Sequence, residues 1–383
     1  MIKRSIQDKL NIYLSKFPIV TLTGVRQCGK STLIKNAFPD YNYVSLESPD
    51  ARDFAINDPR GFLCSYKAPC IFDEVQRTPE LFSYLQAIVD QENTAGRYIL
   101  SGSHNFLLMQ NVSQSLAGRT AVLTLAPLSI AELANEDALP DNTDALMLKG
   151  FYPALYSRNL SPDEYYPSYV QTYIERDVRL LRNIPNANDF IRFIKLLAIR
   201  SGSPINYTEL SASCGISIPT VRAWISVLIQ SYVVFELHPY YKNYSKRLIK
   251  APKLYFYDTG LLCHFLGIES ESQLNNHPMK GAVFETMVVS EYMKSRFFAA
   301  REPHGYYWRD TNQNEVDLLT EDSEGLKAYE IKSGTTMNRK YLQTLSKFAS
   351  LSGISEKDIS CVYSGNQSYY GENGNFIRYT EVW

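Results

Sequence analysis

The sequence has little of three features that mark common protein classes: net charge, clustered cysteines and long apolar runs. Its 383 residues carry 39 basic and 40 acidic side chains, so any contact with nucleic acid must come from a local basic patch. None of the six cysteines forms a C-x-x-C pair, and the five histidines do not cluster near them, which argues against a zinc site. Scattered free thiols fit a reducing compartment.

The absence of long apolar runs bears on location. No run approaches the roughly 18 residues of a membrane span. Residues 1–17 place apolar side chains at helical spacing but lack the continuous apolar centre of a secretory signal peptide. We therefore expect a cytoplasmic chain with no membrane partner. Its 45% hydrophobic and 21% charged residues predict a globular protein, and its length predicts two or three domains.

The rest of the chain is organised around residues 24–32, which have the sequence GVRQCGKST. This segment matches the phosphate-loop pattern G-x-x-x-x-G-K-[ST], between an expected strand at 18–23 and an expected helix at 33–38. Gly24 and Gly29 allow the backbone to fold around phosphates. We expect Lys30 to reach the β- and γ-phosphates and the Ser31 hydroxyl to ligate Mg²⁺.

A second apolar segment, 68–74, ends in two carboxylates and is typical of a Walker B strand. Asp73 is expected to hold Mg²⁺, and Glu74 is expected to orient and polarise the attacking water. A strand that simply ends in solvated acids is the alternative. The phosphate loop upstream favours the catalytic role.

The next expected strand, 97–103, would lie beside this one in a parallel sheet. Ser103 or Asn105 at its end could contact the γ-phosphate, or could instead cap a helix over 105–110. Arg119 could reach a phosphate from within the chain or from a neighbouring copy, and a surface ion pair is the alternative. Arg26 is a second cation near the phosphates. The nucleotide-binding residues are thus expected to be Gly24, Arg26, Gln27, Gly29, Lys30, Ser31, Thr32 and Ser103.

Nine segments along the chain carry a family resemblance: GVRQCGKSTL, IFDEVQ, ILSGSHNFLL, SLAGR, APLSIAEL, GFYPAL, YIERDV, KAPKLYFYDTGL and EIKSG. In these segments the sequence resembles the prokaryotic AAA-type, archaeal-ATPase-like proteins over nearly its whole length. The resemblance implies an AAA-type fold, ATP and Mg²⁺ as cofactors, and assembly into a homo-oligomer. Cys28 replaces a small apolar residue that is usual in that family, and Ser31 replaces threonine. Neither change removes a type of ligand.

Four regions are expected in the α/β chain. Residues 1–135 would form the AAA-type ATPase with a parallel sheet, and 136–189 a helical lid or linker in which Arg176 could sense nucleotide. Residues 190–265 follow the order helix, glycine-containing turn, helix and strands, which is typical of a winged helix-turn-helix. Residues 266–383 would form an α/β C-terminal domain.

Contact with nucleic acid is expected from residues 240–253 rather than from the third helix of that module, whose exposed face has only Arg222 as a cation. This stretch has no acid, and its basic residues alternate with tyrosines, which suits phosphate contact and base stacking. Charged tips on a solvent-exposed hairpin are the alternative. The basic residues are Lys242, Lys246, Arg247, Lys250 and Lys253.

The C-terminal region places two carboxylates and a lysine on consecutive expected strands, 314–319 and 327–332. Asp317 lies on the first, and Glu330 and Lys332, which share a face at period 2, lie on the second. The acids could hold Mg²⁺ while the lysine stabilises the developing charge of phosphodiester hydrolysis. Glu285, on the preceding helix, could add a third ligand. A salt-bridged face with no catalytic role is the alternative.

These residues resemble the D…(D/E)-x-K pattern of the restriction-endonuclease-like superfamily. We interpret the chain as an ATP hydrolase coupled to DNA or RNA binding, with Mg²⁺-dependent cleavage by the C-terminal domain. The alternative is a nucleotide-dependent switch whose C-terminal domain only binds. In the first case the catalytic residues would be Lys30, Glu74, Arg119, Asp317, Glu330 and Lys332, and the metal ligands Ser31, Asp73, Glu285, Asp317 and Glu330.

Overall fold

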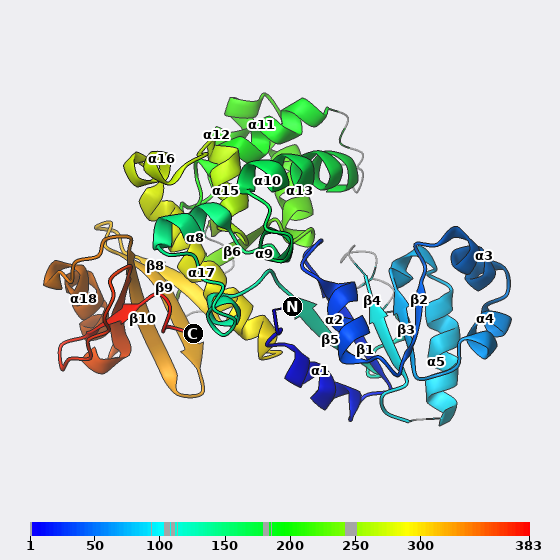
Figure 1. Cartoon of the computed structure of the whole chain (residues 1–383). Coiled ribbons are helices and arrows are strands. Elements are labelled where there is room, and N and C mark those ends of the chain that lie inside the picture. The colour runs from blue at the N-terminus through cyan, green and yellow to red at the C-terminus, as the bar shows by residue number, and fades with distance from the viewer. Residues whose placement is uncertain are drawn as a thin grey trace. The chain divides into compact units, whose positions relative to one another are not determined.

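The computed structural model describes residues 2–92, 94–102, 108, 112, 114–178, 184, 186–241 and 251–383. Two compact units divide the chain. The first comprises the residues up to Leu128 with the short pieces 230–232 and 296–302, and the second comprises the remainder. Figure 1 draws the strands of the first unit in blue to teal and those of the second in green to red.

The first unit is a parallel five-stranded sheet in the order β2-β3-β4-β1-β5. Strand β1 is buried at every position because it lies between two neighbours, with Ile19 opposite both Tyr98 and Thr120. The elements of this unit are α1 (Gln7–Leu14), β1 (Ile19–Gly24), α2 (Lys30–Ala37), β2 (Asn42–Ser45), α3 (Pro49–Asn57), α4 (Pro59–Ser65), β3 (Cys70–Asp73), η1 (Val75–Arg77), α5 (Leu81–Glu92), β4 (Tyr98–Ser101) and β5 (Thr120–Leu125).

Helices α4 and α5 pack on this sheet through apolar side chains. Phe62, Phe72 and Leu85, from α4, β3 and α5, are fully buried in one cluster. Burying a side chain of this size stabilises the fold by about 1.5–3 kcal/mol. All the strands run in one direction, so their carboxyl ends share one edge, where the phosphate loop and the Walker B residues lie. This confirms the expected α/β fold.

The second unit begins with helices and ends in a mixed sheet. Its helices are α7 (Ile130–Ala134), α8 (Thr143–Lys149), α9 (Pro153–Ser157), α10 (Pro162–Tyr169), η2 (Val170–Val178), α11 (Ala187–Ala198), α12 (Tyr207–Cys214), α13 (Ile218–Gln230), α15 (Thr259–Leu266), α16 (Glu271–Asn276), α17 (Lys280–Phe298), η3 (Arg339–Leu342), α18 (Gln343–Ser352) and η4 (Glu356–Asp358). The last residue of α13 and the last three of α17 fall in the first unit. Helix α7, which lies within the residues 1–135 expected to form the ATPase domain, belongs to the second unit, where the Ile130 amide donates to Glu291 at 2.8 Å.

Seven strands form the sheet of this unit, in the order β12-β11-β10-β9-β8-β6-β7. Strands β9 and β10 are an antiparallel hairpin, whereas β10, β11 and β12 are parallel. Helix α18 covers part of the sheet, with Leu345 and Phe348 packed against Ile359 and Cys361. The strands are β6 (Val234–Pro239), β7 (Lys253–Phe256), β8 (Gly305–Arg309), β9 (Glu315–Asp322), β10 (Gly325–Lys332), β11 (Ile359–Tyr363) and β12 (Asn375–Arg378).

The region expected to be a winged helix has the three helices, with Gly215 at a positive φ of 70° in the turn after α12. The two strands that follow, β6 and β7, are not a separate wing. They pair with each other, and β6 pairs with β8, so the expected boundary at residue 265 runs through one sheet. Arg222, the cation noted on the third helix, stacks 4.0 Å above the ring of Tyr207.

Buried tyrosines surround a carboxylate in the helical part of this unit. Asp258 accepts hydrogen bonds from the amides of Leu261 at 2.7 Å and Phe151 at 2.6 Å and from the hydroxyl of Tyr166 at 2.7 Å. A Cβ at Gly150 or Gly260 would overlap the Tyr166 hydroxyl. This network explains why the segments GFYPAL and YDTGL need glycine at these positions.

Candidate functional site

The phosphate loop joins β1 to α2 as the sequence predicts. Gly29 precedes the helix with a φ of 93°, a conformation that a side chain would strain. Gly24 has a φ of 134°, and a Cβ there would overlap the carbonyl oxygen of Leu125 on β5. Both glycines are therefore required by the backbone. Arg26 and Gln27 lie on the loop between them, and Ser31 and Thr32 lie in the first turn of α2.

Lys30 is buried at the start of α2, with 6% of its surface exposed. Its Nζ donates to the carbonyl oxygens of Gly24 at 2.9 Å and Val25 at 2.8 Å. The ammonium is thus held inside the loop that carries it. The amides of a helix N-terminus and an adjacent ammonium form a site suited to phosphate oxygens.

Asp73 ends β3 next to the phosphate loop, and its two carboxylate oxygens have different donors. Oδ1 accepts from the Ser101 hydroxyl and, at 3.1 Å, from the Glu74 amide. Oδ2 accepts from the Tyr43 hydroxyl at 2.6 Å. The register places Ser101 on β4 and Ser45 on β2 directly beside Asp73. The carboxylate is held in place by the neighbouring strands on both sides.

Tyr43 lies beside the two residues expected to hold Mg²⁺. Burial, the hydrogen bond to Asp73 and the Asp73 charge raise the pKa of Tyr43, and the nearby Ser45 and Ser31 hydroxyls oppose the increase. The Ser31 hydroxyl and the Asp73 carboxylate therefore both lie near the Tyr43 phenol. Both offer oxygen ligands, which Mg²⁺ prefers, so these two residues would hold it.

Glu74 follows Asp73 with a positive φ of 55°, which turns the chain sharply after the strand. Its carboxylate accepts a hydrogen bond from the amide of Gln76. Gly102, after β4, leaves room for this glutamine, since a Cβ there would overlap Gln76 Oε1. Glu74 is held at the carboxyl edge of the sheet, and its role in activating water stays a prediction.

The structure does not bring Arg119 to the phosphate loop of its own chain. It lies just before β5, at the opposite edge of the sheet from Gly24, which pairs with Leu125 at the other end of that strand. Its guanidinium forms a bidentate ion pair with Asp90, with 2.8 Å between Nη2 and Oδ2. Of its expected roles, only contact with a neighbouring copy's nucleotide stays open. Ser103, Asn105 and the side chain of Arg176 lie outside the described residues.

The sequence prediction missed Ser101 and Tyr43. They lie on β4 and β2, the two strands that flank the Walker B strand. Ser101 is the one hydroxyl at the end of the apolar strand β4, which was the available signal, since Ser103 two residues later was considered as a sensor. The mixed sequence of β2 gave no such signal for Tyr43.

The second cluster lies where β9 and β10 pair. Asp317, Glu330 and Lys332 come together as predicted. Lys332 Nζ lies 2.6 Å from Glu330 Oε1 and 3.8 Å from Asp317 Oδ2. The Ile331 amide also donates to Asp317 Oδ2 at 2.8 Å. The ammonium therefore lies between the two acids.

Glu285 lies on α17 beside this cluster, but the buried Lys253 already forms an ion pair with it. Lys253 Nζ lies 3.1 Å from Glu285 Oε1 and 2.6 Å from Glu315 Oε1, and the Tyr255 hydroxyl donates to Glu285. The expectation that Lys253 contacts nucleic acid is wrong, because its side chain is 1% exposed and paired with two acids. The other basic residues of that stretch lie outside the described residues.

Burial and like charge perturb the acids of this cluster. Burial and the negative charge of Asp317 raise the pKa of Glu330 to about 7, although Lys332 opposes the shift. Burial, opposed by Lys253, also raises the pKa of Glu285 to about 7, with Asp317 adding to the increase. Burial disfavours the charged form of Lys332, but the charges of Asp317 and Glu330 outweigh it and raise its pKa. The three acids are close enough to repel one another.

Two carboxylates of this cluster, those of Asp317 and Glu330, are available to bind a metal ion. Glu330 Oε2 is buried and has no hydrogen-bond partner among the described residues, which leaves an acceptor for a cation. The described residues contain no group of three or more histidine, cysteine or acidic side chains placed to hold a metal. Asp317 and Glu330 would therefore need water or a substrate oxygen to complete the coordination of a metal ion.

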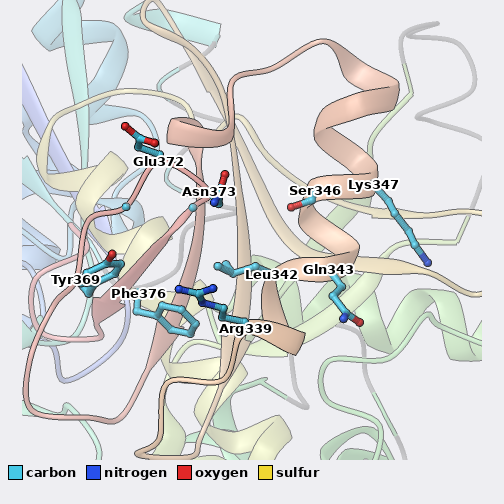
Figure 2. Close-up of a pocket in the computed structure, with 11 residues that line it drawn as sticks. Arg339, Leu342, Gln343, Ser346, Lys347, Tyr369, Glu372, Asn373 and Phe376 are labelled. Carbon is cyan, nitrogen blue, oxygen red and sulfur yellow. The ribbon is translucent and has the colours of Figure 1, made fainter.

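A separate pocket of about 600 Å³ opens between η3–α18 and the loop before β12. Figure 2 shows Arg339 beside Leu342 and Phe376, with Tyr369 next to Phe376 and Lys347 extending outward from α18. None of the clustered acids lines this pocket. It offers cations and an exposed aromatic ring on the same unit as the cluster.

The sheet order, the phosphate loop and the Walker B residues define the first unit as a P-loop ATPase domain. A family model described as "AAA domain" matches residues 16–134, in agreement with this assignment. The chain is an AAA-type ATPase, and this class of protein binds and hydrolyses ATP.

Two curated relatives extend the similarity to the second unit. The chain is 31% identical over 339 residues to the uncharacterized protein Rv2008c of Mycobacterium tuberculosis, covering 87% of this chain and 74% of the relative. The same values hold for the uncharacterized protein Mb2031c of Mycobacterium bovis. The chain belongs to the family of these proteins. Two further family models, each described as a domain of unknown function, match residues 140–272 (DUF8612) and 280–382 (DUF4143).

Solved structures are similar at lower identity. The Walker-type ATPase PABY2304 of Pyrococcus abyssi is 15% identical with a TM-score of 0.48, covering 69% of this chain and 96% of that one. AMPPCP-bound DnaA from Aquifex aeolicus is 14% identical with a TM-score of 0.29, covering 59% and 86%. Within the described part of the chain, no single helix has the length and apolarity to cross a membrane. The pair Tyr207–Cys214 and Ile218–Gln230 passes that test only jointly, across a 101° bend.

Proposed function

We propose that this ATPase binds ATP with Mg²⁺ and uses its cycle to control metal-dependent hydrolysis of a nucleic-acid phosphodiester by the C-terminal cluster. One observation supports the proposed phosphodiester hydrolysis. Two carboxylates on adjacent strands, Asp317 and Glu330, converge with the Lys332 ammonium, and one buried oxygen of Glu330 has no hydrogen-bond partner within the described residues. The cluster combines acceptors for a cation with a donor for an anionic substrate.

At the nucleotide site, each residue has a distinct task. Lys30 and the loop amides bind the phosphates, Ser31 and Asp73 hold the metal, and Glu74 accepts the proton of the attacking water. Mg²⁺, when bound, neutralises charge on the transferred phosphoryl group. Ser101 fixes the orientation of Asp73 through its hydrogen bond.

At the C-terminal cluster, Asp317 and Glu330 would hold the cation and Lys332 would stabilise the negative charge that develops at phosphorus. Water attacks the phosphorus atom, the bond from phosphorus to the leaving sugar oxygen breaks, and that oxygen takes up a proton. The cation, when bound, polarises the phosphoryl oxygen. Lys332 must shift from its 2.6 Å contact with Glu330 toward the substrate.

The pocket beside α18 supports nucleic acid as the substrate class. Arg339 and Lys347 supply cations for phosphates, and the ring of Tyr369, 56% exposed, supplies a surface for base stacking. We expect Tyr369→Ala to weaken binding of single-stranded DNA or RNA about tenfold or more, consistent with the roughly 1–3 kcal/mol of one stacked base. Leu351→Ala, which changes an exposed apolar residue outside the pocket, should leave binding unchanged.

Incubation of the full chain with supercoiled plasmid and Mg²⁺, with and without ATP, tests the proposal. We expect nicking by the wild type and by Asp322→Asn, which changes an exposed acid on the same strand, but not by Asp317→Asn. Lys30→Ala should lose ATP binding and the ATP dependence of nicking, whereas the exposed control Lys67→Ala should not. Absence of cleavage with any divalent metal would overturn the nuclease role and leave the ATPase.

A nucleotide-dependent switch is the second candidate. The observation that favours it is the Lys332 ammonium, which already pairs with both acids, in a cluster without a third free carboxylate. This function predicts nucleic-acid or protein binding that changes with ATP, slow turnover that DNA does not stimulate, and no cleavage. Stimulation of ATP turnover by DNA, together with nicking, would exclude it.

A further inference from the structure

Tyr43 binds one of the side chains assigned to the metal of the ATP site and lies near the other. It lies on β2, the edge strand beside β3. Its hydroxyl donates to Asp73 Oδ2 at 2.6 Å, and the Ser31 hydroxyl lies nearby. The Lys35 ammonium lies 3.8 Å from the centre of its ring, an arrangement that favours this position of the ring.

The contacts of Tyr43 are those that a bound magnesium ion requires. Asp73 Oδ1 already accepts from Ser101 and from the Glu74 amide, so Oδ2 is the oxygen left for a cation or its water shell. Ser31 offers its single hydroxyl oxygen, which a magnesium ion needs as a direct ligand. The phenol occupies Asp73 Oδ2, and a cation at this position would compete with it for that oxygen.

We propose that Tyr43 is a latch on the metal position: its phenol occupies Asp73 Oδ2 in the nucleotide-free protein and must leave before Mg²⁺ and nucleotide bind. The inference rests on the proposed magnesium–nucleotide site and adds its regulation. Because β2 has a neighbouring strand on one side only, the ring can move away without disturbing the inner strands. The Tyr43 phenol therefore opposes binding of the metal ion rather than binding of the nucleotide itself.

Tyr43→Phe tests the latch because it keeps the ring and removes only the hydroxyl. Titration with a non-hydrolysable ATP analogue, in Mg²⁺ and in EDTA, measures the two affinities without turnover. We expect the variant to bind the analogue about tenfold more tightly than wild type in Mg²⁺ and equally in EDTA, since a hydrogen bond to a carboxylate no longer opposes the metal. Lys35→Met, which frees the ring, should shift the affinity in the same direction by a smaller factor.

Tyr41→Phe is the matched control. Tyr41 also precedes β3 in sequence, but its hydroxyl donates to the Gly96 carbonyl at 2.8 Å, away from Ser31 and Asp73. Its affinity should equal that of wild type in both buffers. If wild type binds the analogue with Mg²⁺ but Tyr43→Phe binds equally or more weakly, the latch is overturned and the ATP site stands. If wild type shows no Mg²⁺-dependent binding, the proposed site and the latch fail together.

Discussion

Arg4 donates from Nη1 to the carbonyl oxygen of Cys28 at 2.7 Å, so a residue before the first helix supports the phosphate loop from behind. Its Nη2 also donates to the Ala126 carbonyl at 2.7 Å, just past β5, and the guanidinium lies 5.8 Å from the ring centre of Phe298. Arg4 is buried despite its charge. It ties the loop that carries Lys30 to the adjacent strand.

Replacing Arg4 by alanine should therefore weaken both stability and nucleotide binding. The buried carbonyl oxygens of Cys28, Ala126 and Pro127 lose a donor, and we expect the free energy of unfolding to fall by about 2–4 kcal/mol. Urea denaturation measures this loss, and titration with an ATP analogue measures the accompanying drop in affinity. Lys16→Ala, at an exposed position close by in sequence, should change neither quantity. Wild-type affinity in a folded Arg4→Ala protein would show that the loop does not depend on this contact.

Variants of Ser101 and Ser103 distinguish the role that the structure gives to Ser101 from the nucleotide contact that the sequence predicted for Ser103. Ser101 donates to Asp73, whereas Ser103 was expected from sequence to act at the nucleotide. Ser101→Ala leaves Asp73 Oδ1 with the Glu74 amide alone, and we expect the ATP turnover number to fall about tenfold with little change in nucleotide affinity in EDTA. Steady-state ATPase assays over a Mg²⁺ titration check this. A greater loss in Ser103→Ala than in Ser101→Ala would contradict it.

Features that depend on residues close together in sequence could be predicted, whereas contacts between residues far apart in sequence could not. The phosphate loop, the acids of β3 and the hairpin acids of β9 and β10 were predictable because a strand's end or its period places them. Tyr43 contacts Asp73 across 30 residues and Arg4 contacts Cys28 across 24, so no local pattern connects them.

For Lys253 the error is of the opposite kind: a local pattern of basic residues predicted an exposed side chain, whereas the side chain is buried. It follows four basic residues in sequence, which suggested an exposed cationic stretch. It also begins the segment Lys253–Phe256, in which the other three residues are apolar, and that strand is buried at every position. The apolar run was the better guide, because the strand lies in the sheet and two acids from other elements neutralise the lysine.

The stability of the second unit should depend on pH through Glu330. Its pKa is raised from an ordinary value of 4.5 to about 7, so between these values the folded chain keeps a proton that the unfolded chain releases. The free energy of unfolding therefore falls as pH rises through this window, by about 1–3 kcal/mol, and levels off above it. Glu330→Gln should reduce this dependence in urea titrations at pH 5, 6, 7 and 8, and Glu285, whose pKa is also raised to about 7, supplies the remainder. The exposed control Glu324→Gln should retain the wild-type slope.

If Asp317 and Glu330 bind Mg²⁺, the ion should change the pH dependence of stability that Glu330 causes. A metal requires the ionised acids, so added Mg²⁺ should raise the melting temperature at pH 8 and have little effect at pH 5. Asp73→Asn as the background, without added nucleotide, removes the contribution of the nucleotide site. An increase that persists in Glu330→Gln would place the metal elsewhere.

Lys253 should be among the most costly residues to change in the second unit. Lys253→Met leaves Glu285 and Glu315 without their shared cation, and removing one partner of a buried ion pair typically costs about 3–5 kcal/mol. Lys327→Met breaks the exposed pair with Glu324, at 2.7 Å, and should cost less than about 1 kcal/mol. Urea titration of both variants gives the comparison. Adding Glu285→Gln to Lys253→Met should recover part of the loss, because the unpaired charge is then removed. Equal costs for the two lysines would mean that burial does not set the strength of the Lys253 network.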